Sequence, residues 1–145
     1  MKILVCTDSS KHSMKALKMA AQVAAGCKAD TIDIVHVYHV DLHLSDLHST
    51  VSQIEQYEFM QKFKKEEGEK ILDAAARVFA GLNAEVNTIL KEGHPAGTII
   101  KMAAAGNYDL IVMGSRGLGG LKKALLGSVS NAVLQEVQTS VLIVK

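Results

Sequence analysis

The chain has 145 residues, of which 48% are hydrophobic and 21% are charged, and this composition excludes a disordered protein and favours one folded domain over residues 1–145. The formal net charge is +1 and the lysines and arginines are scattered, so we expect neither nucleic acid nor a membrane as a partner.

The cysteines and the N-terminus indicate an ordinary intracellular chain. Cys6 and Cys27 have no metal-binding or disulfide spacing, so we expect two reduced thiols. The first apolar run ends before Asp8, which makes it too short for a signal peptide or a spanning helix. A cytoplasmic location is therefore the expectation.

The first elements are a strand and a helix. Residues 3–6 form a continuous apolar run before polar turn residues, which predicts a strand buried on both faces. Apolar residues then recur at steps of three and four from Met14 onward. Ser9 or Ser10 can cap the start of this helix, and Gly26 is a stop signal for its end.

The second strand is predicted over residues 32–40 and a long helix over residues 51–80. Gly68 weakens the middle of that helix by about 1 kcal/mol relative to Ala. The charged run at residues 62–67 is most simply a solvated helix face. A third strand is predicted over residues 84–90, with Val86 and Thr88 facing inward and Glu85 and Asn87 facing outward, as in an edge strand.

The second half of the chain continues the alternation. Pro95 can start a helix whose apolar stripe continues to Gly106. The remaining predicted elements are a strand at 110–113, a helix at 129–137 and a strand at 141–144. Strands separated by helices run parallel, because each crossover returns the chain to the same edge. The sequence therefore predicts a doubly wound, open α/β sheet with helices on both faces.

A glycine-rich loop follows the strand at 110–113, with five glycines from Gly114 to Gly127. Glycine lets backbone N–H groups approach phosphate oxygens, and a helix that begins at Gly127-Ser128 presents the positive end of its dipole. In open α/β sheets, ligands collect at the carboxyl ends of the strands. The loop matches neither the P-loop pattern nor the dinucleotide fingerprint, and a merely flexible turn is the alternative.

The spacing of this loop resembles that of the universal stress proteins. Their nucleotide-binding members have Gly, two residues, Gly, nine residues, Gly and Ser or Thr, and this chain has Gly114, Gly117 and Gly127-Ser128. The likeness extends to Val5–Ser10, His36-Val37, Gly93–Ala96 and Val112–Gly114. It implies a Rossmann-like fold of the adenine nucleotide alpha hydrolase-like type, with five parallel strands in the order 3-2-1-4-5.

The resemblance also implies an adenine nucleotide, ATP or else AMP or ADP, as the ligand. Asp8 would lie near the ribose and phosphates, Val37 would contact adenine, and Met113 would border the base and ribose. Glycines would admit the phosphates, and Ser128 and Ser130 would hydrogen-bond them. The full set of implied binding residues is Thr7, Asp8, Val37, Met113, Gly114, Arg116, Gly117, Gly127, Ser128, Val129 and Ser130.

Asp8 is also the candidate metal ligand, because a carboxylate beside phosphates suits Mg²⁺. Its alternative role is that of a turn residue that starts the helix, and core packing is an equal alternative for Val37 and Met113. Two positions differ from the family. Ser9 stands where the family often has Gly, and Ser140 replaces the usual Pro before the last strand.

Histidines gather after the second strand, but their spacing matches no firm metal signature. The group consists of His36, His39, His43 and His48, with Asp41 and Asp46. We favour a polar loop near the nucleotide pocket over a metal site. His94 is interpreted as a turn residue before Pro95, while Lys122 and Lys123 either screen phosphate charge or form a solvated flank.

Three functions remain open from the sequence. The favoured one is a nucleotide-dependent stress-response or signalling module with unknown protein clients and slow or no hydrolysis. The alternatives are a true ATP hydrolase or other nucleotide-converting enzyme, for which no convincing catalytic group besides Asp8 and His94 is visible, and a nucleotide-free dimeric scaffold. The apolar strand at 141–144 would lie at a sheet edge, and the resemblance implies a homodimer through it.

Overall fold

The computed structural model describes residues 1–41, 50–119 and 126–145, and these contain a five-stranded sheet in the order β3-β2-β1-β4-β5. Every pair of neighbouring strands is parallel. The strands are β1 (Lys2–Cys6), β2 (Thr31–Tyr38), β3 (Glu85–Glu92), β4 (Leu110–Gly114) and β5 (Ser140–Val144). The predicted fold class and strand order are thus confirmed.

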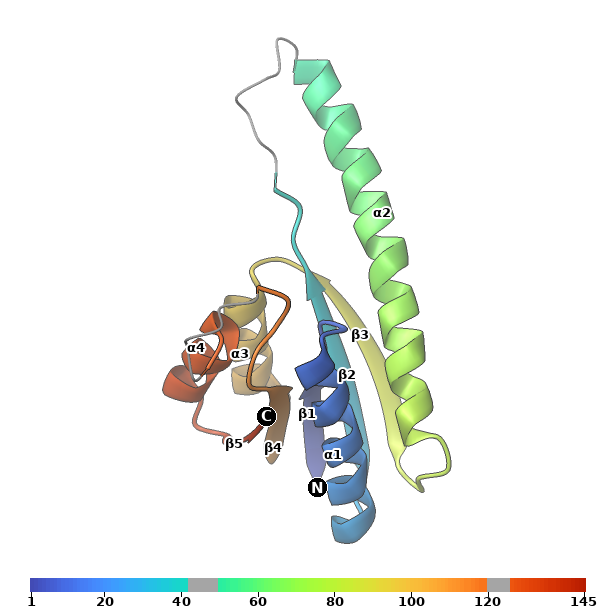
Figure 1. Cartoon of the computed structure of the whole chain (residues 1–145), viewed down its shortest axis with the longest axis vertical. Coiled ribbons are helices and arrows are strands. Elements are labelled where there is room, and N and C mark those ends of the chain that lie inside the picture. Colours follow the sequence, from blue (N-terminus) through green and yellow to red (C-terminus); the bar gives the residue numbers. More distant parts are fainter. Residues whose placement is uncertain (42–49, 120–125) are drawn as a thin grey trace.

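Helices cover both faces of the sheet (Figure 1). One face carries α1 (Lys11–Cys27) and α2 (Thr50–Ala76), which a 3₁₀ turn at Arg77–Phe79 follows, and the other carries α3 (Pro95–Gly106) and α4 (Ser128–Glu136). Successive strand residues point to opposite faces, so Ile3 and Val5 pack under α1 and α2. Leu4 and Cys6 pack under α3 and α4. No helix in the described ranges is long and apolar enough to cross a membrane.

The start of α1 agrees with the sequence, whereas its end does not. Ser10 is the N-cap, and its hydroxyl accepts a hydrogen bond from the Ser13 N–H at 3.1 Å. The helix continues past the predicted stop at Gly26 to Cys27, and Lys28 ends it in the left-handed conformation with φ 52°. The stop signal was wrong by one residue, because Lys28 adopts the conformation that usually favours glycine.

The predicted alternation along β3 is wrong at two residues. Thr88 is exposed, although we expected it to face inward, and Asn87 is half-buried, although we expected it to face outward. The Asn87 side-chain amide donates a hydrogen bond to Asp33 Oδ1 at 3.0 Å. The buried Asp33 on β2 therefore orients the Asn87 side chain inward, which the polarity of Asn87 alone did not predict.

Asp33 is the centre of a buried polar cluster at the amino ends of the strands. Its Oδ2 accepts a hydrogen bond from the Tyr108 hydroxyl at 2.7 Å and lies 3.4 Å from Lys2 Nζ, which stands 4.5 Å from the centre of the Tyr108 ring. Burial raises the pKa of Asp33, but hydrogen bonds from Tyr108 and Asn87 and the charge of Lys2 outweigh it and lower the pKa overall. This amino-end cluster, Lys2, Asp33, Asn87 and Tyr108, links β1, β2, β3 and the entry to β4.

The long helix α2 packs against β2 and β3 and extends beyond the carboxyl ends of the strands (Figure 1). At Gly68 this helix packs tightly against side chains of both strands. A Cβ added at Gly68 would come 2.5 Å from Leu90 Cδ1 and 3.0 Å from His36 Cδ2. The glycine that lowers helix propensity is thus the residue that allows α2 to approach the His36 ring.

Candidate functional site

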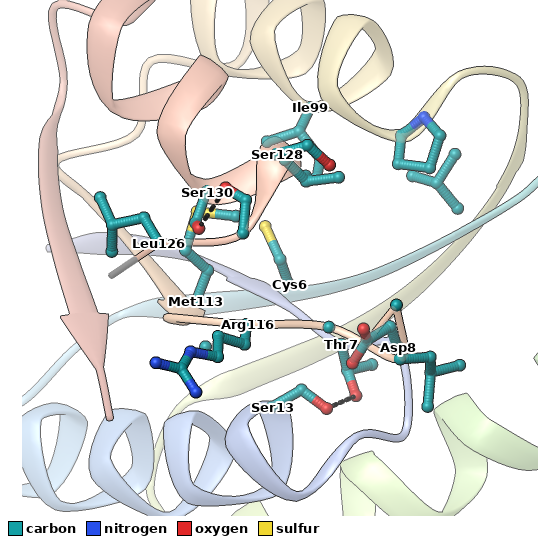
Figure 2. A pocket seen from close by; sticks show the side chains of 18 of the residues that line it. Cys6, Thr7, Asp8, Ser13, Ile99, Met113, Arg116, Leu126, Ser128 and Ser130 are labelled. Atoms are coloured by element: carbon teal, nitrogen blue, oxygen red, sulfur yellow. Dashed lines mark hydrogen bonds between the residues drawn. The ribbon is translucent and has the colours of Figure 1, made fainter. Parts of the chain in front are cut away.

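A cavity of about 250 Å³ opens at the carboxyl ends of β1 and β4, on the face that α3 and α4 cover. Its position is the one that parallel α/β sheets use for ligands. All the binding residues that the sequence implied line this cavity: Thr7, Asp8, Val37, Met113, Gly114, Arg116, Gly117, Gly127, Ser128, Val129 and Ser130. Figure 2 shows several of them around it, contributed by the turn after β1, by β4 and the loop after it, and by the start of α4.

Other residues also line the cavity that the sequence did not imply as individual binding residues: Cys6, Ser13, Val35, Pro95 and Ile99, and within the glycine-rich loop Leu118, Gly119 and Leu126. Strand periodicity contained a signal for two of them. Val35 lies two residues before Val37 on β2 and shares its face. Cys6 shares a face with Leu4, which packs in the core beneath α3 and α4. Ile99 comes from α3, and only the folded arrangement brings that helix to the loop.

The cavity has an apolar wall made by Val35, Val37, Ile99 and Met113, together with Cys6. Burial raises the pKa of the Cys6 thiol to about 12, so this side chain is protonated at neutral pH and behaves as a small apolar group. Such a surface suits a flat, weakly polar ring.

The turn between β1 and α1 supplies the opposite, polar wall. Asp8 Oδ1 accepts a hydrogen bond from the Ser10 N–H at 3.0 Å. Its other oxygen faces the glycine-rich loop, since a Cβ added at Gly117 would lie 2.5 Å from Asp8 Oδ2. Figure 2 shows Asp8 beside Thr7 at this side of the cavity, with Arg116 extending away from it. The absence of a Cβ at Gly117 therefore leaves room for the Asp8 carboxylate.

The other two glycines of the implied motif have different surroundings. A Cβ at Gly114 would come 2.8 Å from the backbone of His12 and Ser13, so Gly114 is needed for β4 to pack against the start of α1. A Cβ at Gly127 would come no closer than 3.4 Å to Arg116 Cα. A side chain at Gly127 would therefore not clash severely, and the effect of this glycine is that no side chain covers the start of α4.

The N-terminus of α4 faces the cavity without a side-chain cap. Gly127 occupies the N-cap position, where no side chain of the described residues accepts a hydrogen bond from the first turn, in contrast to Ser10 at the start of α1. The buried Ser130 hydroxyl donates toward the carbonyl oxygens of Ser115 at 3.1 Å and Gly127 at 3.0 Å. Backbone N–H groups, rather than this hydroxyl, are thus the donors that an anion would meet here.

Several residues that the sequence singled out either fall outside the described residues or do not line the cavity. Gly120, Lys122, Lys123, His43, Asp46 and His48 are outside the described residues. His39 Nε2 lies 2.9 Å from Asp41 Oδ1, and His94 is the N-cap residue of α3. Within the described ranges, no three His, Cys, Asp or Glu side chains gather as a metal site.

Comparisons with known proteins agree with this geometry. The model of the universal stress protein family matches residues 1–145. Universal stress protein YxiE of Bacillus subtilis is 35% identical, over 99% of this chain and 98% of that protein. The solved structure of MJ0577, a universal stress protein of Methanocaldococcus jannaschii, superposes with a TM-score of 0.81 at 30% identity, over 99% of this chain and 94% of that chain. A universal stress protein solved in complex with cAMP has a TM-score of 0.69 at 27% identity, over 100% and 97% of the two chains.

Proposed function

The chain belongs to the universal stress protein family, and we propose that it binds an adenine nucleotide in this cavity as a nucleotide-dependent stress-response or signalling module. The observation that carries the proposal is the open N-terminus of α4 beside Gly117 and Asp8. An uncapped helix start at the carboxyl ends of parallel strands is a binding site for phosphate.

The two walls of the cavity suggest an orientation for the nucleotide. The adenine ring would lie on the apolar wall, against Val37 and Met113, and the phosphates would extend toward Gly117 and the first turn of α4. The relative solved with cAMP binds a ligand that combines the same base with a phosphate. ATP, ADP and AMP share those two parts and are the ligands that we propose for this chain.

Asp8 fits a magnesium ion that accompanies the phosphates. One of its oxygens accepts a hydrogen bond from the Ser10 N–H, while the other lies beside Gly117, and both Asp8 and Gly117 line the cavity. Mg²⁺ prefers one or two carboxylates together with phosphate oxygens and water. When bound, the ion would neutralise phosphate charge next to the carboxylate, and Asp8 is the residue that would hold it.

We propose binding with slow or no hydrolysis. Asp8 carries the only carboxylate among the described residues that line the cavity. Binding that is equal for substrate and transition state lowers no barrier. The nucleotide would then act by changing which protein clients the domain holds.

The proposal is tested by isothermal titration of the purified protein with ATP and with AMP. Gly117→Val should weaken binding at least about tenfold, because its side chain would occupy the space between the loop and Asp8. Gly26→Val is the matched control, because a Cβ at Gly26 meets nothing within 4 Å and the residue is absent from the cavity lining. Equal affinities of wild type and Gly117→Val, or no binding by wild type, would contradict the assignment.

A further inference from the structure

His36 is buried on β2 behind the candidate site, and it makes a hydrogen bond that the proposed function does not require. Its ring Nδ1 lies 2.8 Å from the carbonyl oxygen of Thr7. A carbonyl oxygen can only accept, so Nδ1 carries the proton and donates it. His36 is 8% exposed and does not line the cavity, which excludes direct contact with a ligand there.

The bond fixes the peptide group between Thr7 and Asp8. The Thr7 N–H donates to the Val35 carbonyl at 3.0 Å, so both backbone groups of Thr7 point toward β2. The described residues contain no cis peptide bonds, and in a planar trans peptide the N–H points opposite to the C=O. The N–H of Asp8 therefore points away from β2, toward β4, which lies on the other side of β1.

That direction is the side of the cavity formed by the end of β4 and the loop after it. Gly114 and Gly117 lie there and line the cavity together with Thr7 and Asp8. Helix α2 restrains the ring from the other side, because Gly68 allows the helix to approach His36 Cδ2 so closely. The His36 ring is thus held between the end of β1 and α2.

We propose that His36 is a positioning residue for nucleotide binding. By donating to the Thr7 carbonyl, it keeps the Asp8 N–H turned toward the cavity as a hydrogen-bond donor for an oxygen of the nucleotide. Without this donor, the Thr7-Asp8 peptide loses the interaction that selects its orientation. This inference rests on the proposed function and adds a residue that does not touch the ligand.

The test compares two substitutions at the same position. In His36→Asn the amide nitrogen stands as many bonds from Cα as Nδ1 does and can donate to the Thr7 carbonyl, whereas His36→Phe keeps a ring without a donor. We expect the Kd for ATP, measured by titration calorimetry, to stay within about threefold of wild type for His36→Asn and to rise about tenfold for His36→Phe. Tyr108→Phe, which removes a buried hydrogen bond at the amino ends of the strands, should lower stability and leave the Kd unchanged.

Nuclear magnetic resonance of the wild-type protein supplies a second measurement that needs no variant to fold. The imidazole ¹⁵N shifts of neutral His36 should show a protonated Nδ1 and an unprotonated Nε2, and the Asp8 amide resonance should shift when ATP is added. A proton on Nε2 alone, an unmoved Asp8 amide, or a His36→Phe variant that binds as wild type does would overturn the role of His36. Failure of wild type to bind ATP or AMP would overturn the proposed function as well.

Discussion

Ser9 adopts a backbone φ of 64° in the turn between β1 and α1. This left-handed conformation is unfavourable for a residue with a Cβ, and glycine adopts it at little cost. The sequence differs here from the Asp-Gly-Ser that the family often has, and the structure shows that the chain keeps the glycine conformation with a serine. The side chain of Ser9 is exposed, so little packing opposes its removal.

Ser9→Gly should therefore stabilise the protein. We expect the free energy of unfolding to rise by about 0.5–1 kcal/mol, since relief of the left-handed strain exceeds the extra chain entropy of glycine. Urea denaturation followed by circular dichroism measures this change. Ser10→Gly is the contrasting variant, because Ser10 has an ordinary φ of −66° and caps α1, and its replacement should lower stability. A loss of stability in Ser9→Gly would show that the turn is not strained.

At individual residues, the family resemblance implied a set of residues that all line the cavity, but it left out others and did not show what each one contacts. The spacing of Gly114, Gly117 and Gly127 located the loop, yet the clearance for Asp8 at Gly117 and the packing of α1 on Gly114 depend on residues distant in the chain. Ser130 is the clearest case. The resemblance implied a donor to phosphate, whereas its hydroxyl donates to protein carbonyls.

At the scale of elements, buried strands and capped helices were predictable because their signals are local. The apolar run of β1, the cap at Ser10 and the proline at the start of α3 all have the predicted roles. The orientation of Asn87 and the tight packing at Gly68 were not predictable from local sequence. Asn87 is oriented by Asp33 on the neighbouring strand, and Gly68 packs against His36 and Leu90, which only the folded sheet brings next to α2. The strand order came from family resemblance, since periodicity alone does not select it.

Strand β5 is the element from which we predict association. It pairs with β4, and among the described residues no strand pairs with its outer edge. Its residues Val141–Val144 are apolar and half-buried. An apolar edge with unpaired backbone groups invites pairing, and two copies joined by their β5 edges about a two-fold axis form a closed dimer.

Light scattering with size-exclusion chromatography measures this association. Wild type should have twice the 15.6 kDa mass of one chain, and Leu142→Lys should shift the mass toward that of a monomer, because a charge on β5 opposes edge pairing. Leu134→Lys is the control, since Leu134 is 45% exposed on α4, and it should remain dimeric. A monomeric wild type contradicts the dimer, and a dimeric Leu142→Lys moves the interface to another surface.

Over the whole molecule, the two ends of the parallel sheet differ: the carboxyl ends form the cavity, and the amino ends carry the buried polar cluster. The cavity at the carboxyl ends contains the uncapped N-terminus of α4 and the Asp8 carboxylate. A cavity and an uncapped helix end both leave stabilising interactions unmade. The amino-end cluster ties β1, β2, β3 and the entry to β4 through hydrogen bonds and an ion pair. Changes in the ligand site can therefore alter binding while the opposite end maintains the fold.

The same cluster couples unfolding to the uptake of a proton. Because the folded state lowers the pKa of Asp33, the unfolded chain binds this proton more tightly, and the stability from its carboxylate is present above the unfolded pKa of about 3.9. That stability is lost as the pH falls through the lower pKa of the folded state. We expect the free energy of unfolding of wild type to exceed that of Asp33→Asn at about pH 6 and the difference to shrink below about pH 4. Urea denaturation at several pH values measures it, and a difference independent of pH would show that Asp33 contributes no charge to the fold.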